Sequence, residues 1–110
     1  MPSKYLLGLT NPVSPEREAE YNDWYTNTHL PEVTALPGFK GARRFRATAS
    51  QPAPGAVPQY SYLALYELDD VDEALDALAT ASHLVLSTSV AVDMSVFAVE
   101  EIADDVKDAH

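Results

Sequence analysis

The sequence predicts an α+β fold in which four strands and two helices follow one another in the order β-α-β-β-α-β. Four segments are short and rich in apolar, aromatic and β-branched residues, as strands are. Between the first and second of them, and between the third and fourth, residues recur at helical spacing behind capping residues. This order is the split βαβ, or ferredoxin-like, motif. Right-handed crossovers then place both helices on one face of a four-stranded antiparallel sheet.

The first strand and the first helix are predicted before the Pro37-Gly38 pair. Residues 4–10 are apolar and aromatic and end at an Asn-Pro pair, which indicates a strand. Ser14 and Pro15 follow as a predicted N-cap and first helical residue. Pro31 disfavours helical backbone at the residue before it, so we expect the helix to end or kink there, with room for one or two further turns. One face of this helix carries Tyr21, Trp24, Tyr25, Thr28 and Glu32.

Two strands joined by a proline-rich loop follow. Residues 39–48 predict the second strand, in which alternation places Arg43 on the same face as Phe39. Residues 49–58 contain three prolines and a glycine and predict a loop that cannot pair in a sheet. Residues 59–68 predict the third strand, one face of which carries Tyr60, Tyr62, Ala64 and Tyr66.

The second helix and the last strand complete the order. Asp70 and Glu73 form a capping arrangement before a short, alanine-rich helix. Residues 83–89 fit either a helical turn or a linker. Residues 90–102 alternate in pattern and predict the final strand.

Size and composition are those of one globular domain. The chain has 110 residues, of which 46% are hydrophobic and 22% are charged, and these values exclude a disordered chain. We assign residues 1–103 to a single domain and residues 104–110 to a polar C-terminal tail.

The charge balance excludes several classes of partner. Seven Lys and Arg residues against 17 Asp and Glu residues give a net charge of −10. Such a chain does not hold a nucleic-acid backbone without a segregated basic face, and it does not seek an anionic membrane. The absence of cysteine excludes a disulfide scaffold and a thiolate nucleophile. We therefore expect a small-molecule partner, with no nucleic acid and no membrane.

The first residues do not have the composition of a targeting segment. They contain one lysine and a very short apolar patch, which is too little for a secretory signal, and no run of 18 apolar residues occurs. The expected location is the cytoplasm.

The second face of the predicted sheet has no cover within the chain. Its residues are apolar and aromatic, and exposed apolar patches above about a few hundred Å² are rare on monomers. A second copy packed sheet to sheet is the simplest cover, and twofold dimers are the commonest oligomers. We expect a homodimer through this open sheet face.

Residues 20–45 carry the most informative motif of the chain. They read Trp-Tyr-x-x-x-His-x-Pro, then Pro-Gly-Phe, then Ala-Arg-Arg-Phe. This order resembles the dimeric α/β-barrel superfamily, in particular its EthD-like family, and the detailed resemblance covers about residues 15–46. It implies a dimeric α/β barrel built from ferredoxin-like domains. The superfamily includes lyases, isomerases, polyketide cyclases, cofactor-free monooxygenases and haem-handling proteins, so the fold does not name a substrate.

His29 is the candidate acid–base residue. It follows Tyr25 by four residues, which places the imidazole beside the phenol on a helix. Pro31 leaves it near a predicted helix C-terminus, where the dipole favours the protonated imidazole. An imidazole with a pKa of about 6.5 exchanges protons at neutral pH. The resemblance implies that the matching histidine lies at the mouth of the cleft between sheet and helices. The alternative is a histidine that caps the helix or bonds a loop carbonyl.

The aromatic residues of the helix and of the third strand allow two interpretations. Tyr21, Trp24 and Tyr25 at helical spacing are typical of a core, and Trp24 is expected to anchor the helix to the sheet. A buried phenol also needs a hydrogen-bond partner, so Tyr25, or one of the strand tyrosines Tyr60, Tyr62 and Tyr66, could orient a substrate hydroxyl or carbonyl.

Four of the seven basic residues lie within residues 40–46. They indicate either a solvated or interface strand paired with acidic helices, or an anion clamp. Arg43 is the sharper candidate for a clamp, because alternation directs it to the face of Phe39, where it would stabilise a carboxylate or an enolate.

His83, directly after the second helix, is either a second acid–base residue or an exposed histidine at a helix end. The three histidines are scattered and form no metal-ligand spacing, and no Gly-rich phosphate loop or nucleophile elbow is present. We expect no metal and no cofactor.

The leading hypothesis is a small cofactor-free enzyme in a catabolic or secondary-metabolite pathway. It would perform acid–base chemistry (dehydration, isomerisation or cyclisation) on an apolar, oxygenated organic molecule. The predicted catalytic residues are His29, Tyr25 and Arg43. The predicted substrate-binding residues are Leu7, Leu9, Tyr21, Trp24, Phe39, Tyr62, His83 and Phe97.

Two other hypotheses remain open. A cofactor-free monooxygenase would use the same Trp, Tyr and His set to deprotonate a phenolic or polyketide-like substrate before it reacts with oxygen. A non-enzymatic binding or accessory protein would hold haem or a small hydrophobic ligand.

Overall fold

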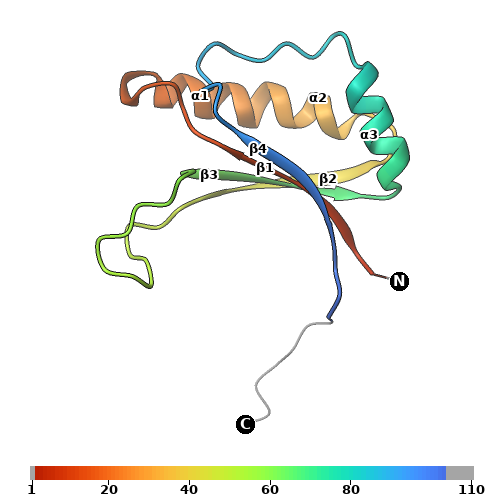
Figure 1. Cartoon of the computed structure of the whole chain (residues 1–110). Coiled ribbons are helices and arrows are strands. Elements are labelled where there is room, and N and C mark those ends of the chain that lie inside the picture. Colours follow the sequence, from red (N-terminus) through yellow and green to blue (C-terminus); the bar gives the residue numbers. More distant parts are fainter. Residues whose placement is uncertain (1, 104–110) are drawn as a thin grey trace.

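The computed structural model describes residues 2–103 and shows a four-stranded antiparallel sheet with helices on one face (Figure 1). The strands stand in the order β2-β3-β1-β4, so β1 and β3 are central. The predicted α+β class and ferredoxin-like order are confirmed. The elements are β1 Lys4–Thr10, α1 Glu18–Trp24, α2 Leu30–Thr34, β2 Phe39–Arg46, β3 Tyr62–Leu68, α3 Val71–Thr80 and β4 Ser95–Glu100. The predicted tail, residues 104–110, lies outside the described residues.

The first helical segment passes Pro31 instead of ending there. A 3-10 turn at Pro15–Arg17 leads into α1, a π turn at Tyr25–His29 follows, and α2 continues from Leu30. Leu30 has helical backbone angles (φ −57°, ψ −49°), and its N–H bonds to the carbonyl of Tyr25 five residues back. The prediction that the helix ends at Pro31 is therefore wrong. A proline lacks an N–H and crowds the carbonyl four residues before it, and the wider π turn accommodates both defects.

The start of this helical segment also differs from the expected cap. Ser14 has extended backbone, but its side chain makes no capping hydrogen bond. Pro15 opens the 3-10 turn, and the N–H of Arg17 bonds to the Ser14 carbonyl at 3.1 Å. The backbone supplies the contact that the side chain was expected to make.

A β-bulge near the start of β2 changes which side chains share a face. Phe39 and Gly41 pair with adjacent residues of β3, so Lys40 is the extra residue. The prediction that Arg43 shares the face of Phe39 is wrong for this reason. Phe39 and Arg44 point to the helix side of the sheet, and Arg43 points to the other side.

The facing ends of β2 and β3 are shorter than the predicted strands 39–48 and 59–68. At this end the side chain of Asn11 forms hydrogen bonds with the backbone that precedes β3. Its amide donates to the Gln59 carbonyl (2.9 Å), and its oxygen accepts the Ser61 N–H (2.7 Å). These bonds stand in for a β1 backbone partner, while on the β2 side the Ala47 N–H bonds to the Ser61 carbonyl at 2.8 Å.

β4 covers half of the predicted strand 90–102. Val90 makes one isolated bridge, to Pro12. The residues next to this pair make its hydrogen bonds, from the Val13 N–H to the Ser89 carbonyl (2.7 Å) and from the Ala91 N–H to the Asn11 carbonyl (2.9 Å). Regular pairing with β1 begins only at Ser95.

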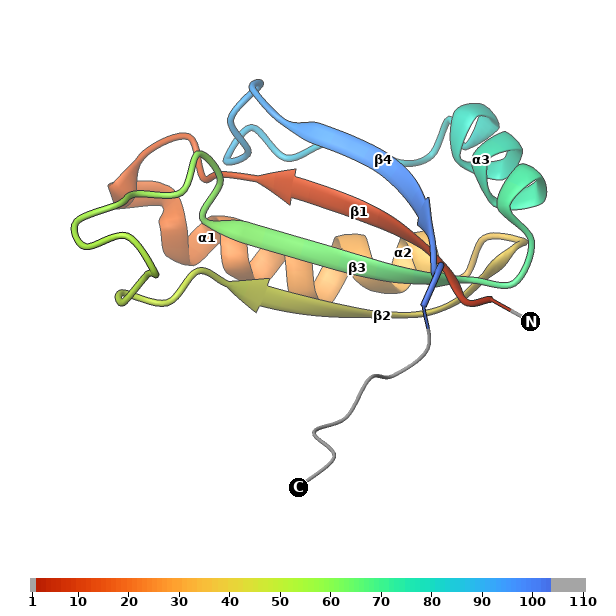
Figure 2. The same ribbon diagram turned by 60° about the horizontal axis from the view of Figure 1, so that its bottom comes forward.

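The sheet has a covered face and an open face. The covered face and the helices enclose the core, whereas the strands lie bare on the other side (Figure 2). Alternation sorts the strand residues between the two faces. The apolar side chains of the open face are Tyr5, Leu7, Leu9, Phe45, Leu63, Leu65, Phe97 and Val99.

The turn before β2 fits tightly against α3. Asp70 caps α3 as predicted, its side chain accepting the N–H of Glu73 at 2.9 Å. Gly38 has a φ of +89°, and a Cβ built on it would lie 2.5 Å from the backbone nitrogen of Ala74. A glycine is therefore required here both by conformation and by space.

We expect Gly38→Ala to lower the free energy of unfolding by about 2–4 kcal/mol, from left-handed strain plus overpacking against α3. Gly55 is the matched control, because it has a φ of +77° and nothing within 4 Å of its added Cβ. Gly55→Ala should cost only the strain, about 1–2 kcal/mol. Urea denaturation at one protein concentration measures both values, and equal losses would contradict the close fit of α3.

Candidate active site

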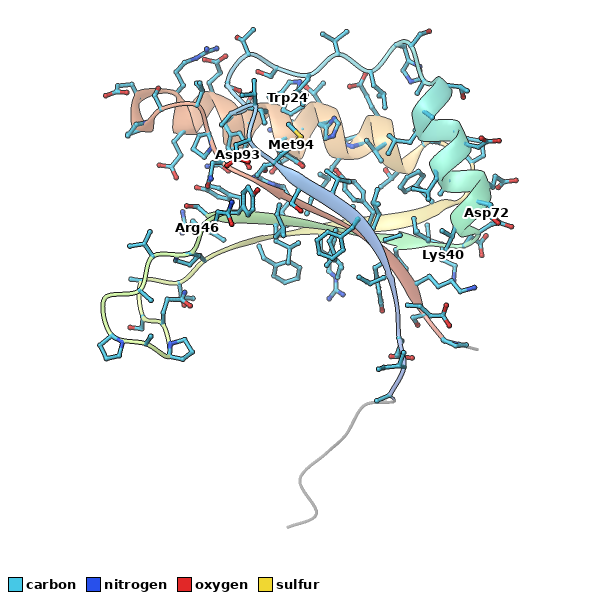
Figure 3. The ribbon with its side chains drawn as sticks, viewed as in Figure 1. Trp24, Lys40, Arg46, Asp72, Asp93 and Met94 are labelled. Atoms are coloured by element: carbon cyan, nitrogen blue, oxygen red, sulfur yellow. The ribbon has the colours of Figure 1, made fainter. Side chains whose placement is uncertain are left out.

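A small apolar cavity of about 100 Å³ lies between the covered face of the sheet and the helices. Its floor comes from β1, β3 and β4, one wall from the helical segment around the π turn, and the remaining cover from α3 and the irregular chain after it. Met94, in that irregular chain, points from the start of β4 toward the helices (Figure 3). The lining residues are Leu6, Gly8, Thr10, Tyr25, His29, Val33, Tyr66, Leu78, Leu86, Met94 and Val96.

The π turn places His29 between two aromatic rings. Its imidazole stacks on the Trp24 indole, with centroids 4.6 Å apart and planes at 20°. It meets the Tyr25 ring edge-on at 5.1 Å and 85°. Residues five apart are about 140° apart around an α-helix. The stacking of Trp24 on His29 is thus a consequence of the wider π turn, and the sequence pattern alone does not predict it.

Burial makes His29 a base at neutral pH. Removal from solvent lowers the pKa of His29 from its ordinary 6.5, and the carboxylate of Glu32 opposes part of that shift. The sequence predicts the opposite, because it places His29 at a helix C-terminus. Since the helix continues to Thr34, no free carbonyl end lies at His29, and desolvation decides the direction.

The phenols in the cavity remain protonated. Burial raises the pKa of Tyr25. Burial and then the neighbouring Tyr25 raise the pKa of Tyr66. Thr10 lines the same cavity, and its hydroxyl is hydrogen-bonded to the Tyr21 phenol at 2.5 Å. The cavity therefore combines one neutral imidazole with phenolic O–H donors in an apolar enclosure.

Arg44, rather than Arg43, lies beneath the helix next to these phenols. Its guanidinium lies 4.5 Å from the centroid of Tyr25, which is a cation–π contact. Its Nη1 donates to the Thr26 hydroxyl at 3.0 Å, while its Nη2 is buried without a hydrogen-bond partner. Arg43 is exposed on the open face, with its guanidinium over Phe45. The bulge at the start of β2 explains why Arg44, and not Arg43, lies on the helix side of the sheet.

Three predicted substrate-binding residues lie on the wrong face for this cavity. Leu7 and Phe97 pair across β1 and β4 on the open face, and Leu9 shares that face. Side chains two residues apart on a strand point the same way, so their even-numbered neighbours line the cavity instead. The lining residues Leu6 and Val96 are two of these neighbours.

The buried aromatic residues divide between core and cavity. Tyr21 is fully buried. Phe39 packs edge-to-face on Tyr66 at 5.9 Å. The Tyr62 phenol donates to the carboxylate of Glu18 at 2.5 Å, away from the cavity. Tyr66, which shares a strand face with Tyr62, is the strand tyrosine that lines the cavity.

Trp24 and His83 have separate positions. Trp24 lies on the helix and is half-buried (Figure 3). Its ring stacks on His29 but does not line the cavity. His83 is exposed and faces an open groove that also includes Glu73 and Asp76. The structure therefore brings Tyr25 and His29 together in the cavity, with Trp24 adjacent, and leaves His83 apart.

Several lining residues were not singled out from the sequence. Gly8 and Thr10 come from β1, and Leu86 and Met94 come from the irregular chain. Alternation along β1 would have identified the first two, because Leu6, Gly8 and Thr10 share one face. The irregular chain has no periodicity that could have indicated its contribution.

The described part of the chain contains neither a metal-binding cluster nor a membrane-spanning helix. Among residues 2–103, no group of three or more His, Asp or Glu side chains is placed to hold a metal ion. Within the same range, no helix has the length and apolar character needed to cross a membrane.

The fold is that of a solved EthD family structure. The chain matches an ethyl tert-butyl ether d (EthD) family protein from Bacillus halodurans C-125 with a TM-score of 0.62 and 19% identity, over 93% of this chain and 100% of that chain. At this identity the match shows the fold alone. It confirms the EthD-like fold that the Trp-Tyr-x-x-x-His-x-Pro motif predicts.

The chain belongs to the family described as Domain of unknown function (DUF4286), whose model matches residues 4–81. It is also 40% identical over 67 residues to "Core atranone cluster (CAC) protein 1" from Stachybotrys chlorohalonatus. That match covers 60% of this chain and 26% of the relative, so the chain spans about a quarter of the relative's length.

The buried position of His29 predicts a pH-dependent contribution to stability. Because its pKa is lowered on folding, the neutral imidazole stabilises the fold above about pH 6.5, and this contribution is lost as the pH falls through the folded pKa. The free energy of unfolding of the wild type should therefore fall relative to that of His29→Gln between about pH 7.5 and pH 5. Urea denaturation at several pH values measures this. A constant difference would contradict a buried, neutral His29.

Proposed function

We propose that this chain is a cofactor-free enzyme that transfers protons on an apolar, oxygenated small molecule bound in the cavity. One observation carries the proposal: His29 is the one imidazole among the described lining residues, burial favours its neutral, proton-accepting form by lowering its pKa, and it lies in a mainly apolar cavity beside phenolic donors. A general base acts best when its pKa lies near the working pH and when it is within reach of the substrate.

The proposed reaction uses His29 as the base and a phenol as the hydrogen-bond donor. The neutral imidazole takes a proton from a carbon next to a carbonyl group. Tyr25 or Tyr66 donates to the carbonyl oxygen as it gains negative charge, and such a donor is effective because it is already in place when the charge develops. The imidazolium so formed is stabilised by the face of Trp24, on which it already stacks. Return of the proton to a different atom gives isomerisation. Dehydration follows when the imidazolium gives the proton to a hydroxyl group on the neighbouring carbon, which leaves as water as the carbon–carbon double bond forms.

The partial match to a core atranone cluster protein supports a place in a secondary-metabolite pathway over a catabolic one. It bears on a quarter of that relative and names no reaction. The pathway assignment therefore rests on that name, and the chemical assignment rests on the cavity.

Exchange of carbon-bound hydrogen in D₂O tests the chemistry without knowledge of the natural substrate. With acetone and cyclopentanone as probes, the wild type should speed the exchange of protons next to the carbonyl group, as followed by NMR. His29→Gln should reduce that rate by about 10²–10⁴-fold. Tyr25→Phe keeps the ring and removes a donor, and its expected loss is about 10²–10³-fold if it serves the oxyanion.

Stability measurements separate catalysis from structure in these variants. Both should fold, because each substitution keeps most of the side-chain volume. An exchange rate that is unchanged in a folded His29→Gln protein would exclude the proposed base. A binding or accessory role for the cavity would then be favoured.

We also propose that the chain forms a homodimer through the open sheet face. Phe45 and Phe97 are 44% and 45% exposed there, within a face composed mainly of apolar side chains. Burial of such a face against a second copy removes it from water on both subunits. The cavity lies on the opposite side of each sheet, so the dimer leaves it free.

Light scattering should give twice the chain mass of 12.0 kDa. Phe97→Glu places a charge in the open face and should give a monomer. Val92→Glu is the control, because Val92 is 93% exposed and lies outside the strands. A monomeric wild type, or a dimer that survives Phe97→Glu, would contradict this interface.

A further inference from the structure

The floor of the cavity contains a glycine that its backbone does not require. Gly8 is in the middle of the central strand β1, opposite Ala64 on one side and Val96 on the other. Within residues 2–103, only Gly38 and Gly55 have a positive φ, so Gly8 has a backbone that any residue adopts. A glycine weakens a strand interior, typically by about 0.5–1 kcal/mol relative to alanine. The backbone therefore gives no reason for a glycine here, and the effect of the missing side chain is to leave space in the cavity above Gly8.

That space lies between the two phenols of the cavity. A Cβ built on Gly8 would lie 3.4 Å from the Tyr25 hydroxyl and 3.8 Å from the Tyr66 ring. Its third neighbour is the Ala64 methyl, at 3.9 Å. These are ordinary contact distances, so a methyl group fits without moving the backbone. It would also cover the Tyr25 hydroxyl on the cavity side.

The cavity volume limits what enters. About 100 Å³ is less than the roughly 150 Å³ of an engineered apolar cavity that binds benzene, and far below the roughly 300 Å³ at which pockets for drug-sized ligands begin. A methyl group is comparable to one water molecule, whose share of liquid volume is about 30 Å³. An alanine at Gly8 would therefore reduce a space that is already small.

We propose that Gly8 is the specificity-determining residue of this cavity, and that the ligand inserts a single small ring bearing one oxygen against it. The proposal rests on the proposed function in taking this cavity as the ligand site. The ring lies over the bare backbone of Gly8, and its oxygen reaches the Tyr25 hydroxyl that an alanine would cover. The neutral state of His29 suits an uncharged ligand, such as a cyclic ketone, over a carboxylate.

Binding of ketones of increasing size tests this directly. Acetone, cyclopentanone and cyclohexanone are titrated into ¹⁵N-labelled protein, and shifts of cavity resonances give the dissociation constants. Gly8→Ala should raise the dissociation constants of the two cyclic ketones by about 10–200-fold, which is the range for one methylene in an apolar pocket. The dissociation constant of acetone should rise by much less. Gly41→Ala is the matched control, because its added Cβ meets nothing within 4 Å, and its affinities should equal those of the wild type.

A second variant keeps the test decisive if Gly8→Ala loses stability. Val96 lines the same floor and pairs with Gly8 across the strands. Val96→Ala enlarges the space, so it should increase the affinity for cyclohexanone relative to that for acetone. Added to Gly8→Ala, it should partly restore the affinity for cyclic ketones. If Gly8→Ala lowers the affinity for all three ketones equally, or for none of them, the proposed role of Gly8 is overturned.

The two proposals fail in different ways. If the wild type binds cyclic ketones in a manner that depends on Gly8 but shows no exchange that depends on His29, the cavity is a ring-binding site and the enzymatic proposal fails. If exchange depends on His29 but the Gly8 and Gly41 variants discriminate ketones alike, the specificity proposal fails and the enzymatic one stands.

Discussion

The π turn at Tyr25–His29 is the constraint on which the rest of the site depends. It ends two residues before Pro31, whose ring and missing N–H a regular α-helix does not accept, and it lets the helical segment continue to Thr34. Its wider winding brings the imidazole of His29 onto the face of Trp24 and against the edge of Tyr25. π turns occur often at functional sites. Here one turn both accommodates a proline and orients the one base of the cavity.

Burial then sets the chemistry of the groups that the turn has placed. It lowers the pKa of His29 and raises that of Tyr25, so base and donor coexist at neutral pH. Hydrogen bonding with Tyr66 and then with Thr10 moderates the rise in the pKa of Tyr25, and the positive charge of Arg44 beneath the ring adds a smaller lowering. Within residues 2–103 no carboxylate pairs with this guanidinium, and aromatic faces provide its electrostatic partners. The phenol is therefore a better hydrogen-bond donor than burial alone would leave it.

The sheet separates this chemistry from the proposed subunit interface. Because side chains alternate along each strand, Gly8 and Val96 face the cavity while Leu7 and Phe97 face outward. A shift of one residue in register would exchange the two sets. The bulge at Lys40 makes such a shift within β2, and it brings Arg44 to the phenols and Arg43 to the open face. The same alternation that builds the core thus decides which residues can touch a ligand.

The sequence by itself determined the order of the elements, the strand Lys4–Thr10, the cap at Asp70 and the proximity of Tyr25 to His29. Alternation, capping and helical spacing act within a few residues, so a local pattern is enough to predict them. Only the tertiary structure decided the π turn, the bulge, the direction of the His29 pKa shift and the cavity. Tyr66, Leu86 and Met94 come to His29 from distant parts of the chain, and desolvation depends on all of them together. No local window of sequence contains that information, because burial is a property of the assembled fold.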